Sequence, residues 1–146
     1  MSNPLEARLR TDLNEARRAR DKFRTLVLST TLSDLRNREI EIGEEADEAT
    51  VVEVVAKAVK RRKEAAEQMR AGGREELASK EEAEAEILGE YLPEALSEAQ
   101  VREMVRDLLA QGPREIGPVM GRLMPHLKGR FDGKEANRIV REELAG

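Results

Sequence analysis

The chain has 146 residues, of which 39% are hydrophobic, 38% charged and 2% aromatic, and its formal net charge is −4. This apolar fraction is too high for a disordered chain, and the shortage of aromatic residues disfavours a β-sandwich or barrel. The absence of cysteine excludes disulfides, thiolate nucleophiles and cysteine-based metal sites. Alanine, leucine, glutamate, arginine and lysine dominate, and these are strong helix formers, so the composition predicts an all-α protein.

Four helices are predicted in the first part of the chain, because apolar residues recur every three or four positions between start and stop signals. They cover about residues 5–20, 22–42, 51–71 and 74–91. We expect Asp21 to cap the second helix, and Thr50 to cap the third in a capping box with Glu53. The β-branched run Val51 to Val55 also fits a strand, but strong helix formers follow it to Arg70 without a turn signal.

A linker over residues 92–96 separates these helices from a second helical part, since Pro93 cannot continue the preceding helix. Three shorter helices follow, each with one apolar face, over about residues 98–111, 116–124 and 133–144. Capping boxes are predicted at Ser97 with Gln100 and at Asp132 with Glu135. The sequence therefore predicts two domains, a helical domain over 1–92 and a three-helix bundle over 93–146.

No constellation of residues predicts a catalytic site, a metal site or a cofactor. His126 is the only histidine, and neither a nucleophile elbow nor a phosphate-binding glycine loop accompanies it. The glutamates between residues 75 and 90 lie at helical spacing, which is typical of a solvated acidic face. Gly117 and Gly121 form a Gly-x-x-x-Gly pattern, which in a soluble helix indicates close packing.

The start of the chain predicts a cytoplasmic protein without a membrane partner. Met-Ser-Asn-Pro is followed by a charged amphipathic segment and not by the apolar core of a secretory signal peptide. No apolar run approaches the roughly 20 residues that a membrane-spanning helix needs. The sequence gives no indication of an oligomeric state.

Charge is segregated along the chain. Acidic residues concentrate in residues 39–53 and 75–90, whereas residues 114–141 hold seven basic and three acidic residues, a net charge of +4. Our candidate nucleic-acid-binding residues come from this basic segment: Arg122, Lys128, Arg130, Lys134, Arg138 and Arg141. A second basic band, Lys57 to Lys63, is a weaker candidate because it wraps around more than half of its helix.

Lys128 and Arg130 lie on a glycine-containing turn that leads into a predicted helix N-terminus, where backbone N–H groups and the helix dipole favour an anion. If Asp132 occupied that cap it would oppose phosphate binding, and the residues alone leave the two interpretations even. The scarcity of aromatic side chains argues against base stacking, so we expect any RNA to be bound through its backbone and shape.

Several motifs resemble the YqeY family, and the resemblance covers essentially the whole chain. They are Glu90-Tyr-Leu-Pro93, Ile116-Gly-Pro-Val-Met-Gly121, Leu123-Met-Pro125 and Lys128-Gly-Arg-Phe-Asp-Gly-Lys134. The resemblance implies a helical N-terminal half joined to a three-helix C-terminal half. The family is also similar to the C-terminal region of the GatB subunit of the glutamine-dependent tRNA amidotransferase. That region is a tRNA-binding appendage, separate from the domain that activates the acyl group.

The leading hypothesis is therefore a tRNA-binding accessory module, with components of an amidotransferase or of an aminoacyl-tRNA synthetase as candidate protein partners. One alternative is a component of a carbon–nitrogen ligase that takes its amide from glutamine and acts on misacylated aminoacyl-tRNA. The other is a protein-interaction module, which would dock a partner on the acidic helix over residues 75–90 or on the valine-rich face over residues 51–59.

Overall fold

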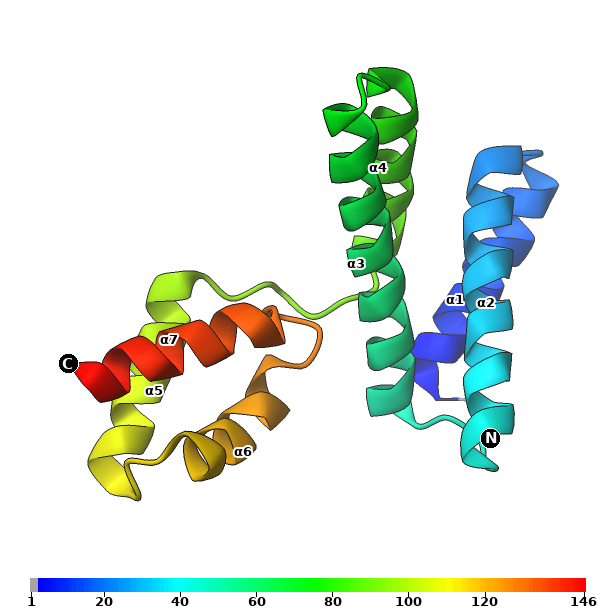
Figure 1. Ribbon diagram of the computed structural model, residues 1–146. Coiled ribbons are helices and arrows are strands. Elements are labelled where there is room, and N and C mark those ends of the chain that lie inside the picture. The colour runs from blue at the N-terminus through cyan, green and yellow to red at the C-terminus, as the bar shows by residue number, and fades with distance from the viewer. Residues whose placement is uncertain (1–2) are drawn as a thin grey trace. The chain divides into compact units, whose positions relative to one another are not determined.

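The computed structural model describes residues 3–146 and forms seven helices and no strand over that range (Figure 1). The helices are α1 (Pro4–Arg18), α2 (Lys22–Ile42), α3 (Glu48–Ala71), α4 (Glu75–Gly89), α5 (Glu98–Gln111), α6 (Ile116–Leu127) and α7 (Gly133–Ala145). This confirms the predicted all-α class. The chain divides into a larger unit, Met1–Leu92, and a smaller unit, Pro93–Gly146. No helix within residues 3–146 is both long and apolar enough to cross a bilayer.

The start and stop signals in the sequence place most helix ends correctly. Asn3 caps α1 by accepting a hydrogen bond from the Glu6 N–H at 2.9 Å, and Asp21 caps α2 in the same way. The capping box between Ser97 and Gln100 is present at the start of α5. Helix α2 ends at Gly43, whose φ of 76° lies in the left-handed region that glycine adopts most easily.

One predicted cap is wrong, and a second residue lies at the predicted cap position without the predicted hydrogen bond. Helix α3 begins earlier than expected, because Asp47 accepts a hydrogen bond from the Thr50 N–H at 2.8 Å and Thr50 lies inside the helix. Aspartate is a better N-cap than threonine, so the earlier start is favoured. At α7 the side chain of Asp132 makes no capping hydrogen bond. The first N–H groups of α7 are therefore not bound by that carboxylate.

The core of the larger unit is built from all four of its helices. Long side chains from α1 and α2 meet α3 and α4, and Leu9, Leu28, Leu35 and Leu88 are fully enclosed. The valines at 51, 55 and 59 are also buried in this core. These three valines of the face over residues 51–59 are therefore not available to a partner, because they already pack inside the unit.

The end of α4 is tied to α1 and α2 by a polar cluster around Tyr91, whose side chain is almost completely buried. The Tyr91 hydroxyl donates a hydrogen bond to the Asp12 carboxylate, and the Arg8 guanidinium lies 4.5 Å from the ring centroid. Arg24 pairs with Glu90 at 3.3 Å beside it. The Glu90-Tyr-Leu-Pro motif thus has a structural role, which is to fasten the last turn of α4.

Burial and the neighbouring Asp12 carboxylate raise the pKa of Tyr91 to about 12. A raised pKa means that the stabilisation by the protonated phenol is fully present below pH ~10 and is lost as the pH rises through 12. Tyr91 is the only tyrosine and there is no tryptophan, so the ultraviolet absorbance of phenolate follows this one group. We expect the native protein to titrate near 12, and Asp12→Asn to lower that value. Titration of the folded protein at the ordinary value near 10 would contradict this.

The smaller unit is a three-helix bundle in which each helix contributes three buried residues from one of its faces. These core residues are Val101, Val105, Leu109, Val119, Leu123, Leu127, Ala136, Ile139 and Val140. The segment before α5 is fixed to the turn between α6 and α7 by two hydrogen bonds. Leu96 N–H donates to the Arg130 carbonyl at 2.9 Å, and Arg130 Nε donates to the Glu94 carbonyl at 3.0 Å.

Helix α6 contains residues that usually disfavour a helix. It continues through Pro125 to Leu127, whereas the sequence predicted an end before Pro125; the extension lets Leu127 reach the core. A Cβ atom at Gly117 or Gly121 would meet nothing within 4 Å beyond its chain neighbours and the backbone of its own helix. These glycines therefore do not mark close packing inside the smaller unit, contrary to the interpretation of the Gly-x-x-x-Gly pattern.

Candidate nucleic-acid interface

The six predicted basic residues lie on two helices of the smaller unit and on the turn between them. Arg122 is on α6, Lys128 and Arg130 are on the turn, and the remaining three are on α7: Lys134, Arg138 and Arg141. Their surroundings differ, and the differences separate the residues that could bind a phosphate from those that are already engaged.

Arg138 is neutralised by carboxylates. It forms ion pairs with Glu98 on α5, with Glu135 at 2.8 Å and with Glu142 at 2.5 Å. These hydrogen bonds raise the pKa of the Arg138 guanidinium above its ordinary value, and Glu142 has a lowered pKa because Arg102 and Arg138 bind it. A phosphate at Arg138 would have to displace three carboxylates, so we do not retain this residue in the candidate interface.

Arg138 belongs to an ion-pair network that joins α5 to α7. Arg102 pairs with Glu142 at 2.6 Å and with Glu143 at 3.0 Å, and Arg106 pairs with Glu143 at 2.6 Å. With Glu98 and Glu135 the network holds three basic and four acidic residues, a net charge of −1. This part of the smaller unit is therefore not a basic surface, although it contains three arginines.

Arg130 and Arg141 are held by neutral groups. Arg130 donates to the backbone carbonyl of Glu94, and Arg141 Nε donates to Asn137 Oδ1 at 2.7 Å. A carbonyl or amide partner orients a guanidinium without cancelling its charge. Both residues therefore remain candidates for electrostatic contact with RNA phosphates, and Arg130 has a structural role as well.

Arg122 and Lys134 are exposed and have no ion pair or hydrogen bond within residues 3–146. The Arg122 guanidinium lies against Gly112, where a Cβ atom would come within 2.7 Å of Nη1. Lys134 lies in the first turn of α7, next to the N–H groups that Asp132 does not cap. Arg114, just before α6, is also exposed without an ion pair in the described chain; the sequence counted its charge but did not select it.

The second basic band, on α3, is divided among different roles. Arg61 pairs with Asp34 at 3.1 Å, while Arg62 is mostly buried, donates to the Ala58 carbonyl at 3.1 Å and faces Glu84. Lys57 and Lys63 are exposed. The band therefore does not form one continuous surface of available cations.

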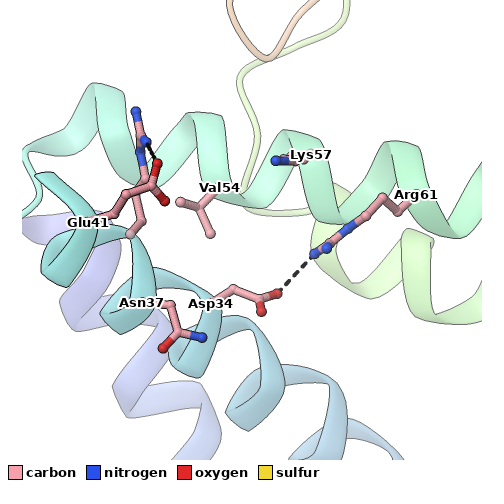
Figure 2. A pocket seen from close by; sticks show the side chains of 7 residues that line it. Asp34, Asn37, Glu41, Val54, Lys57 and Arg61 are labelled. Atoms are coloured by element: carbon pink, nitrogen blue, oxygen red, sulfur yellow. Dashed lines mark hydrogen bonds and ion pairs between the residues drawn. The ribbon is translucent and has the colours of Figure 1, made fainter.

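A hollow of about 170 Å³ lies between α2 and α3, and Figure 2 shows it together with the ion pair between Asp34 and Arg61. Arg38 and Glu41, on α2, form a second pair at its edge. Ligand pockets commonly measure about 300–1,000 Å³ and are mostly apolar. This hollow is smaller, and most of its charged side chains are already paired with one another.

Comparison with curated proteins finds relatives named "Altered inheritance of mitochondria protein 41, mitochondrial" in several fungi. The protein of Lachancea thermotolerans is 32% identical over 108 residues, which is 72% of this chain and 58% of the relative. That of Pyrenophora tritici-repentis is 27% identical over 146 residues, covering 96% and 81%. That of Saccharomyces cerevisiae strain YJM789 is 30% identical over 104 residues, covering 69% and 56%. The matches with the two yeasts thus span less than two thirds of those proteins' own length.

The name of these relatives contains the word mitochondrial, and this finding contradicts the cytoplasmic location predicted from the sequence. The prediction was wrong because its reasoning excluded only secretory and membrane-spanning segments. Mitochondrial targeting segments are amphipathic and basic, so the lack of an apolar segment says nothing about them.

The family model described as "Yqey-like protein" matches residues 6–144. The match includes all the motifs from Glu90 to Lys134 on which the resemblance was based, and it extends through both units. The chain therefore belongs to the YqeY family.

Proposed function

We propose that the protein is a tRNA-binding accessory module, which binds phosphates and helical shape with the α6–α7 side of its smaller unit. One observation carries the proposal: seven of the nine lysines and arginines of this unit fall into two sets. Arg102, Arg106 and Arg138 are neutralised by glutamates, whereas four others have no carboxylate partner within the described residues: Arg122, Arg130, Lys134 and Arg141.

The start of α7 adds to the electrostatic attraction. Backbone N–H groups and the helix dipole give a helix N-terminus a partial positive charge, and Lys134 lies in that first turn. The sequence left open whether the Asp132 carboxylate would accept hydrogen bonds from these N–H groups. In the structure its side chain makes no capping hydrogen bond. The resemblance to the GatB tail is the reason to propose tRNA in particular.

A filter-binding titration of bulk tRNA over a range of salt concentrations tests the proposal. Four phosphate contacts predict that log K falls with log[salt] with a slope of roughly −3 to −4. The double variant Arg122→Ala/Lys134→Ala removes two of these cations. We expect roughly tenfold weaker binding at low salt and a slope shallower by about 1.5.

The matched control is Lys57→Ala/Lys63→Ala, which removes the same charge from two exposed lysines on α3. It should bind tRNA almost as the unmodified protein does, because the larger unit does not take part in the proposed contact. Binding that is absent at low salt, or that both double variants weaken equally, would remove the α6–α7 side of the smaller unit as the RNA site.

A further inference from the structure

Helix α2 has an exposed stripe without charged residues that the other helices of the larger unit leave uncovered. Its members are spaced alternately four and three residues apart, the spacing of a seam between two helices: Leu26, Thr30, Ser33, Asn37 and Ile40. Leu26 is 60% exposed and Ile40 is 73% exposed, and the only other exposed large hydrophobic residue in the described chain is Leu77 on α4. Asn37 also borders the hollow between α2 and α3.

The stripe is not a by-product of packing within the larger unit. Helix α2 meets the core with other residues, among them Val27, Leu28 and Leu35. A surface helix normally has one apolar face and an opposite face of charged residues. Helix α2 has large apolar side chains on both sides, although 38% of the residues in the chain are charged.

We propose that the stripe binds a second copy of this chain, with the two α2 helices antiparallel and crossing at Ser33. Leu26 and Ile40 each lie seven residues from Ser33. A twofold axis at Ser33 therefore brings Leu26 of one copy beside Ile40 of the other, at both ends of the contact. The small side chain of Ser33 lets the two backbones approach closely at the crossing point.

One charged residue near each end of the stripe is placed so that it meets an opposite charge in the antiparallel pair of helices. Lys22 is the first residue of α2 and Glu44 lies two residues past its end; each is eleven residues from Ser33 along the chain, and neither has an ion pair among residues 3–146. The antiparallel arrangement brings Lys22 toward Glu44 of the other copy at both ends, whereas a parallel one would bring like charges together. Because the pattern is complementary to itself, it favours a second copy over an unrelated partner.

The size of the contact indicates a reversible dimer. At 1.5 Å per residue, the 21 residues of α2 span roughly 31 Å. A single pair of helices of this length buries less than the roughly 1,600 Å² of a standard stable interface. We therefore expect a dissociation constant on the order of micromolar. The inference is independent of the proposed RNA site, which lies in the smaller unit.

Sedimentation velocity of the full chain, from low micromolar to several hundred micromolar concentrations, measures the association directly. The average mass should rise with concentration toward twice that of the monomer. Leu26→Glu and Ile40→Lys should each keep the protein monomeric. The two substitutions combined in one chain should restore the dimer, because the introduced carboxylate then faces the introduced ammonium of the other copy at both ends.

Leu77→Glu is the matched control, because Leu77 is an exposed leucine, 44% exposed, outside the stripe. It should leave association unchanged, and far-ultraviolet circular dichroism should show every variant folded. A mass that stays at the monomer value over the whole range would overturn the proposal. So would a folded double variant that remains monomeric, or a loss of dimer in Leu77→Glu equal to that in Ile40→Lys.

Discussion

Replacing Ile139 by alanine should leave the smaller unit largely unfolded at room temperature. Ile139 is completely buried in the middle of α7, within the nine-residue core of a bundle that spans only Pro93–Gly146. Truncating a buried isoleucine to alanine costs about 2–5 kcal/mol. A single core of this size rarely supplies more than about 3–5 kcal/mol, so the substitution removes most or all of the stability of the bundle.

Two-dimensional NMR gives the clearest measurement for Ile139→Ala, since amide signals from α5, α6 and α7 should lose their dispersion. Arg141→Ala serves as the control on the same helix. Arg141 is exposed, so its replacement should change the free energy of unfolding by no more than about 0.5 kcal/mol. A dispersed spectrum and an unchanged urea midpoint for Ile139→Ala would show that Ile139 does not hold the bundle together.

Removal of the Glu84 carboxylate should destabilise the larger unit by roughly 2–3 kcal/mol. Arg62 Nε lies 3.9 Å from Glu84 Oε1, and the two side chains are only 13% and 14% exposed. That nitrogen is buried and has no hydrogen-bond partner within the described residues. Glu84→Ala would therefore leave a guanidinium charge largely shielded from water without its counter-charge, which costs more than the ion pair itself contributes.

The double variant Arg62→Met/Glu84→Leu tests this explanation. Removing both charges avoids the unpaired ion, and two apolar side chains of similar volume can pack between α3 and α4, so most of the lost stability should return. Urea unfolding followed by the fluorescence of Tyr91 measures both variants, with Glu86→Ala as an exposed control on the same helix. A double variant no more stable than Glu84→Ala would refute the role of the uncompensated charge.

Local signals in the sequence were sufficient to find the helices, but not all of their ends. Asp21 and Ser97 cap the helices they were expected to cap, because each is followed directly by a periodic apolar pattern. At α3, both Asp47 and Thr50 are good caps, and the residues between them fit a helix or a loop. The pattern alone could not decide between them.

The candidate interface shows a different limit. The net charge summed over residues 114–141 made Arg138 look available for a phosphate. The sum stopped one residue before Glu142, which pairs with Arg138. The spacing of Arg138 and Glu142 was visible in the sequence as a pair four residues apart on one helix. The ion pair with Glu98 could not be found in this way, since it depends on how α5 packs beside α7.

Helix α6 depends on its neighbours for its very existence. With Gly117, Gly121 and two prolines among twelve residues, it is a poor helix former, and its helix is stabilised mainly by the burial of Val119, Leu123 and Leu127. This implies an order of assembly. We expect α5, which has a complete capping box, to form turns of helix early, and α6 to become helical only once the other two helices offer it an apolar surface.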